Sequence, residues 1–182
     1  MAFPVFFDTC AIHGAGLSDL LLTMAEKGLF RPLWSDGVLG ELRGALLRAG
    51  IAADAVEHRL TSMGDAFPDA RVTGYMALIS QMSCDENDRH VLAAAVRGGA
   101  AVLVTFNLKH FPQTALDEYG LSAAHPDEFL LDQLDLYPAK TVEAVTQVPA
   151  LYENPPVTVA EFLDVLHRSG VPKFATAVNM LT

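Results

Sequence analysis

Short apolar runs alternate along this chain with longer stretches in which apolar and polar residues are mixed. The runs predict buried strands over residues 3–7, 30–34 and 101–105, and a weaker strand over residues 121–124. In the longer stretches, apolar residues recur with the spacing of helices that bury one face. The predicted helices span residues 18–27, 36–48, 52–63, 74–82, 85–97, 113–119 and 126–136. Strands that alternate with helices are typical of an α/β fold with a parallel sheet.

Residues that favour helix ends support these boundaries. We expect Ser18 to cap the first helix and Gly28 to follow its end. After about Pro138 the pattern changes to helices alone, and Thr158 and Glu161 form the sequence pattern of a capping box. The chain is therefore expected to have two parts. These are a three-layer α/β/α domain over residues 1–135 and a small helical C-terminal appendage over residues 136–182.

The composition indicates a folded, non-membrane protein. Of the 182 residues, 51% are hydrophobic, so disorder is not expected. No apolar run reaches the roughly 18 residues that span a bilayer, and the N-terminus has no basic stretch typical of a signal peptide. Cys10 and Cys84 lack the paired spacing of a zinc site or a disulfide framework. We expect two free thiols, a cytoplasmic location and no membrane partner.

The negative charge is concentrated in one late segment. The net charge of −10 argues against non-specific binding of nucleic acid. However, residues 113–135 carry six acids and no Lys or Arg, whereas residues 1–112 carry nine Lys or Arg against twelve Asp or Glu. If a metal ion neutralises some of the acids in residues 1–112, the surface of this segment could still bind nucleic acid.

Four polar residues stand where their neighbours are apolar. Asp8 follows the first strand and Asn107 follows the strand 101–105, and ligands of parallel sheets bind beyond such strand ends. Glu41 and Asp88 each align with the apolar stripe of a predicted helix. A carboxylate there is costly unless it is paired or bound to a metal. We expect these four residues to meet around Mg²⁺ or Mn²⁺, which prefer oxygen ligands.

Each of these residues also has a simpler role when it is taken alone. Asp85 is better explained as a helix N-cap than as a ligand. Asp88 can act as an N-terminal capping residue of the same helix, because the positive end of the helix dipole favours acids. The other simple roles are a backbone turn for Asp8 and Asn107, and an ion pair with Arg43, Arg89 or another base for Glu41. The metal site is favoured because the four residues occur together.

Four segments resemble the motifs of PIN-domain nucleases, and specifically of VapC-type toxins from bacterial toxin–antitoxin pairs. They are residues 5–10 with Asp8, 35–42 with Glu41, 85–95 with Asp88, and 102–112 with Asn107. The resemblance spans about residues 3–135 and depends on the order and spacing of the motifs. It implies a PIN-like α/β/α fold and a ribonuclease that uses Mg²⁺ or Mn²⁺. Residues 136–182 look like the helical extension of a longer VapC-like subgroup.

The resemblance also implies roles for single residues. Asn107 stands where many relatives carry a fourth acid, so the number of bound ions stays open, although an amide still offers an oxygen ligand. By motif match, Asp8, Glu41 and Asp88 are the metal ligands, Asn107 belongs to the catalytic set, and Thr9, Thr105 and Asp85 support it.

Basic residues beside these acids are candidates for substrate binding. Arg89 and Lys109 are predicted to bind RNA phosphates, with ordinary surface or ion-pair roles as the alternative. His90 and His110 are expected to be packing or surface residues rather than general bases. His110 stands where an acid often precedes Phe in this motif.

The predicted reaction is hydrolysis of RNA phosphodiester bonds. A cation held by Asp8, Glu41 and Asp88 is expected to position a phosphate and to activate water for in-line attack. A VapC-type toxin implies a small antitoxin partner, for which the apolar helices near residues 17–30 and 39–63 are candidate docking surfaces. Core packing is the alternative role of those helices, and a homodimer stays open.

Two other functions compete with this prediction. One is a PIN-like module that binds RNA or protein and has weak or lost catalysis because of Asn107. The other is a phosphotransferase with Asp8 as its nucleophile. The second is disfavoured, because that chemistry wants another Asp two residues later and Cys10 stands there.

Overall fold

A five-stranded parallel sheet forms the centre of the computed structural model, which describes residues 2–181. Its strand order is β3-β2-β1-β4-β5, and every neighbouring pair is parallel. The strands are β1 (Pro4–Phe7), β2 (Arg31–Ser35), β3 (Arg71–Val72), β4 (Val102–Val104) and β5 (Ser122–Ala124). The predicted parallel sheet is confirmed. The sequence did not predict β3, because two residues are too few to give a pattern.

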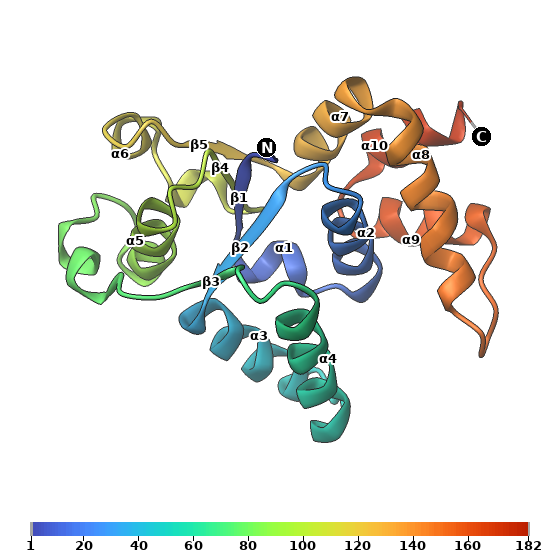
Figure 1. The fold of residues 1–182 in the computed structure, drawn as a ribbon, viewed down its shortest axis with the longest axis horizontal. Helices are drawn as coiled ribbons and strands as arrows, with labels where there is room; N and C mark the ends of the chain where they lie inside the picture. The colour runs from blue at the N-terminus through green and yellow to red at the C-terminus, as the bar shows by residue number, and fades with distance from the viewer. Residues whose placement is uncertain (1, 182) are drawn as a thin grey trace.

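Helices cover both faces of this sheet (Figure 1). The helices of the first part are α1 (Thr9–Ile12), α2 (Ala15–Glu26), α3 (Asp36–Arg48), α4 (Ala53–Ala66), α5 (Arg89–Arg97), α6 (Gln113–Asp117) and α7 (Pro126–Leu136). Short 3₁₀ helices are η1 (Met76–Gln81), η2 (Glu86–Asp88) and η3 (Leu108–His110). In Figure 1, α5 lies on one side of the sheet and α2 on the other. This arrangement is the expected three-layer α/β/α architecture.

Two of the predicted helices begin differently in the structure. Ser18 was wrong as an N-cap, because α2 begins at Ala15 after Gly14 and Ser18 is buried within the helix. The helix predicted over residues 85–97 is divided into η2 and α5, with Asp85 as the N-cap of η2. Asp88 therefore lies at the junction of these two helices, and its side chain makes no capping hydrogen bond to α5.

The C-terminal region consists of helices, as predicted. They are α8 (Pro138–Gln147), η4 (Val148–Leu151), α9 (Val159–Arg168) and α10 (Pro172–Asn179), and both α8 and α9 pack against α2. The Thr158–Glu161 capping box at the start of α9 is present. The expected boundary between residues 1–135 and 136–182 stays a prediction, and the end residues Met1 and Thr182 lie outside the described part.

Buried contacts hold α7 against the sheet and join α10 to α7. Phe129 of α7 packs edge-on against Phe7 of β1 and against Phe30, with ring centroids 6.2 Å and 5.1 Å apart. The buried carboxylate of Asp127 accepts hydrogen bonds from the backbone N–H groups of Lys173 and Phe174, at 3.1 Å and 2.8 Å. It thereby caps α10 from another element. Within residues 2–181, no helix combines the length and apolar character that crossing a bilayer requires.

Candidate metal centre

The carboxyl ends of β1 and β4 place Asp8 beside Thr105. Phe7 pairs with Val104 in the sheet, so the residues that follow them lie next to one another. The Asp8 N–H donates to the Val104 carbonyl at 3.1 Å, and the Thr105 hydroxyl donates to Asp8 Oδ2 at 2.7 Å. Both side chains are buried. The predicted position of Asp8 at a strand end, adjacent to the strand that precedes Asn107, is confirmed.

A small hydrogen-bond network holds one oxygen of Asp8. The Cys10 thiol donates to Oδ2 at 3.1 Å, and the Phe106 N–H donates to Cys10 Sγ at 3.3 Å. Burial and then the charge of Asp8 raise the pKa of Cys10 to about 11, so the thiol keeps its proton at neutral pH. The Asn107 N–H donates to the Thr105 hydroxyl at 3.0 Å. Oδ1 of Asp8 has no hydrogen bond within the described residues and remains available to a ligand.

Glu41 reaches the same end of the sheet from the first half of α3. Its Oε2 accepts a hydrogen bond from the Thr9 hydroxyl at 2.6 Å, and its Oε1 lies 2.8 Å from Nε2 of His90. Thr9 follows Asp8 directly, and His90 lies two residues after Asp88. Glu41 is therefore tied to the two elements that carry the other predicted ligands.

The environment of Glu41 differs in one respect from the prediction. Val38 and Leu42 are buried as the apolar stripe of α3, but 48% of the Glu41 side chain is exposed. Glu41 was expected to share the buried stripe of its helix, but it lies at the solvent edge of that stripe. The ion pair with Arg43 is not formed either, since Arg43 pairs with Glu57 at 2.7 Å.

Asp88 is partly buried and electrostatically linked to Asp8. Its Oδ2 lies 2.8 Å from Nδ1 of His110, and its side chain makes no capping hydrogen bond to α5. Burial raises the pKa of Asp88, the hydrogen bond to His110 lowers it, and the charge of Asp8 raises it, with a net shift upward. Two negatively charged carboxylates repel each other, and a cation bound between them would relieve this repulsion.

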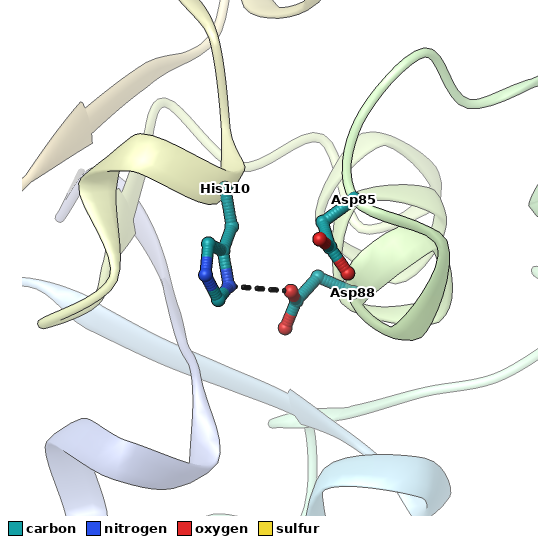
Figure 2. Close-up of side chains that lie close together, drawn as sticks. All are labelled: Asp85, Asp88 and His110. Carbon is teal, nitrogen blue, oxygen red and sulfur yellow. Dashed lines mark hydrogen bonds and ion pairs between the residues drawn. The ribbon is translucent and has the colours of Figure 1, made fainter.

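Asp85 and His110 extend the site around Asp88 (Figure 2). Asp85 accepts a hydrogen bond from the Asn87 N–H at 3.1 Å, which confirms its prediction as an N-cap. Within residues 2–181, one group of three potential ligands has all its donor atoms within 4.8 Å of one another, namely Asp85, Asp88 and His110. Asp8 and Glu41 are not members of this closest group.

The predicted phosphate-binding residues border the site. Arg89 is the first residue of α5, and its Nε is buried with no hydrogen-bond partner in the described part of the chain. Lys109 is exposed in η3. Neither residue forms an ion pair within residues 2–181, and the Asn107 side chain makes no hydrogen bond there. These three side chains therefore form no hydrogen bond or ion pair among the described residues.

The sequence predicted other roles for two histidines than those that the structure shows. We expected His90 and His110 to serve packing or the surface, but each contacts a carboxylate that was predicted to bind metal. For His90 the sequence signal was proximity alone, because it lies two residues after Asp88, whereas His110 also stands at the motif position where relatives often carry an acid. The contacts themselves join residues that are 49 and 22 positions apart.

Comparison with known proteins assigns this α/β domain to a class. Residues 4–109 match the family model of the PIN domain, and residues 126–179 match that of the VapC50 C-terminal domain. The chain belongs to the PIN-domain family, as its motifs predicted. It is 47% identical over 121 residues to a Mycobacterium tuberculosis protein named "Putative ribonuclease VapC50". That match covers 66% of this chain and 71% of the relative, and no solved structure matches the chain.

Proposed function

We propose that this protein is a VapC-type endoribonuclease that hydrolyses RNA with Mg²⁺ or Mn²⁺ as its cofactor. The observation that carries the proposal is the meeting of acids from separate elements at the carboxyl end of the sheet. Asp8 follows β1 and Asp88 precedes α5, yet the charge of Asp8 contributes to the raised pKa of Asp88. Membership of the PIN family and the name of the M. tuberculosis relative support RNA as the substrate.

The donor groups of the site suit a hard divalent cation. Asp8 and Asp88 each keep one carboxylate oxygen without a hydrogen bond among the described residues, and Glu41 adds a third carboxylate. Their mutual repulsion favours a bound cation, and Mg²⁺ and Mn²⁺ prefer oxygen ligands. When bound, such an ion supplies charge for the scissile phosphate and a water of lowered pKa. We assign Asp8, Glu41 and Asp88 as its ligands.

Other residues of the chain position these ligands and the substrate. Thr105 and Cys10 hold one oxygen of Asp8, and its second oxygen makes no hydrogen bond within residues 2–181. Arg89 and Lys109 are proposed to bind RNA phosphates, because each is close in sequence to a site residue and has no ion pair within residues 2–181. Asn107 is proposed to complete the catalytic set as a neutral oxygen donor, with Asp85 in support.

The family relationship also suggests how the activity is used. We propose that residues 1–135 carry the nuclease and that residues 136–182 are an extension packed on it. A VapC-type toxin acts in the cytoplasm on RNA and is controlled by a small antitoxin protein. A homodimer would be a separate property, which sedimentation of the purified protein would measure.

Cleavage of total bacterial RNA by the purified protein tests this function. We expect cleavage with Mg²⁺ or Mn²⁺, none with EDTA, and none from a folded Asp8→Asn variant. RNA binding without cleavage would instead favour a PIN-like binding module. Cleavage that survives both EDTA and Asp8→Asn would contradict the proposal.

A further inference from the structure

Glu41 is the most exposed of the three proposed metal ligands. It has a long side chain that is 48% exposed, whereas Asp8 is buried. A flexible carboxylate loses rotamer entropy when it binds an ion, unless the protein already holds it in place. We propose that His90 is a positioning residue that, together with Thr9, holds Glu41 ready for the cation. This inference rests on the proposed metal-dependent function.

The contacts of Glu41 engage both of its carboxylate oxygens. Thr9 donates to Oε2 at 2.6 Å, and His90 Nε2 lies 2.8 Å from Oε1. Thr9 is the first residue of α1, and His90 is the second residue of α5. Two contacts from different elements restrict rotation of the carboxylate in a way that either contact alone does not.

The imidazole of His90 fits against bare backbone of α3. A Cβ atom added to Gly37 would lie 2.8 Å from His90 Nδ1 and 3.2 Å from the Tyr75 hydroxyl. The Gly37 N–H donates to that hydroxyl at 3.2 Å, so Tyr75 closes the same space. Glycine inside a helix is less favourable than alanine. The space that His90 occupies gives a steric reason for glycine at this position.

The burial of Nδ1 indicates which nitrogen of the His90 ring carries the proton. Nδ1 is buried and has no hydrogen-bond partner within residues 2–181. An unpaired N–H there would be costly, so the proton is placed on Nε2, where it donates to Glu41. In this arrangement the single N–H of the ring is directed at the carboxylate.

Two glycines of α3 provide a matched pair of test positions. A Cβ atom added to Gly37 meets His90, whereas one added to Gly40 meets nothing within 4 Å. Both residues are helical, and neither has a positive φ. Alanine at Gly40 therefore changes helix propensity alone, while alanine at Gly37 also displaces the imidazole.

Calorimetric titration with Mn²⁺ alone, together with the Mn²⁺ dependence of RNA cleavage, tests the inference. We expect His90→Ala to weaken Mn²⁺ binding by about 10-fold, as loss of a residue behind a metal ligand typically does. Cleavage at saturating Mn²⁺ should stay close to the wild-type rate. His90→Gln, which keeps an N–H near the position of Nε2, should recover most of the affinity. Gly37→Ala should bind Mn²⁺ weakly, and Gly40→Ala should match the wild type.

A Glu41→Gln variant separates failure of this inference from failure of the proposed function. If Glu41→Gln binds Mn²⁺ weakly but His90→Ala binds it as the wild type does, the positioning role of His90 is overturned. If the wild type binds no Mn²⁺, or if Glu41→Gln is unchanged, the proposed metal site itself fails. If circular dichroism shows that His90→Ala is unfolded, the Mn²⁺ affinities of Gly37→Ala and Gly40→Ala are compared instead. Equal affinities in these two variants would overturn the inference.

Discussion

Nδ1 of His110 lies 2.8 Å from Oδ2 of Asp88, a contact that joins η3 to the start of α5 (Figure 2). Two neighbouring ligands of an octahedral ion with bonds of about 2.1 Å are about 3.0 Å apart. The two side chains form a hydrogen bond, and the same spacing would suit neighbouring ligands if a bound ion replaced the shared proton, so His110 is a candidate further ligand beside Asp8, Glu41 and Asp88. A nitrogen donor at this position favours transition metals over Mg²⁺.

The first prediction concerns this choice of metal. His110→Asp replaces the nitrogen donor with an acid, so we expect the affinity for Mg²⁺ to rise relative to that for Mn²⁺. Activity measured over a range of each ion gives the ratio of the two half-saturating concentrations. An unchanged ratio would place His110 outside the set of ligands.

A second prediction concerns stability without metal. The pKa of Asp88 is raised in the folded protein, chiefly by burial. The protonated form is therefore favoured on folding, and the stabilisation that it provides is lost as the pH rises through the folded pKa. Asp88→Asn should raise the Tm in EDTA at pH 7 by about 1–2 °C, a small effect because water screens this partly exposed group.

The pH dependence provides the control for that variant. Below the ordinary pKa of an aspartate, the wild type is itself protonated at this position, so the gain from Asp88→Asn should disappear. Differential scanning fluorimetry at several pH values measures the difference. A wild type that is more stable than the variant at pH 7 and less stable at pH 3 would contradict the sign of the shift.

The third prediction concerns the attachment of the C-terminal helices. Asp127 is buried and accepts two backbone hydrogen bonds at the start of α10, whereas its neighbour Glu128 is exposed. Asp127→Ala leaves two N–H groups without their acceptor and should lower the free energy of unfolding by about 2 kcal/mol. Glu128→Ala should change it by less than about 0.5 kcal/mol. Urea denaturation measures both values, and equal losses would refute this capping role.

The fourth prediction links the extension to the site. Gly170 has a φ of +90°, and a Cβ atom added there would lie 2.8 Å from the Phe106 ring. Phe106 is preceded by Thr105 and donates to Cys10, so a shift of its ring disturbs the residues that orient Asp8. Gly170→Ala should therefore reduce cleavage of RNA. Gly50→Ala is the matched control, because its φ is +83° and nothing lies within 4 Å of the added atom.

The sheet and one pair of site residues were predictable because they depend on local sequence. Buried strands leave continuous apolar runs, and a parallel sheet brings the ends of neighbouring strands together, which is why Asp8 and Asn107 were expected to lie close. The side chain that contacts Asp8 is Thr105, two residues before Asn107. The helix cap at Gly14 was not predictable in this way. It uses no side-chain hydrogen bond, so the nearby Ser18 gave a misleading signal.

The parts of the site that were missed depend on contacts between distant segments. A single residue turns a helix by about 100°, so an apolar stripe does not determine whether Glu41 at its edge faces the core or solvent. The roles of His90 and His110 arise from carboxylates on other elements. His90 carries no local pattern that distinguishes a site residue from a surface one, and for His110 the one such signal is its place in the family motif.

The most direct test of the shared metal site is a calorimetric Mn²⁺ titration of the wild type against Asp8→Asn and Asp88→Asn. We expect the wild type to bind Mn²⁺ and both folded variants to lose at least about 10-fold in affinity. Unchanged binding by Asp8→Asn would restrict the ion to the neighbourhood of Asp88 and contradict a site shared by acids from separate elements.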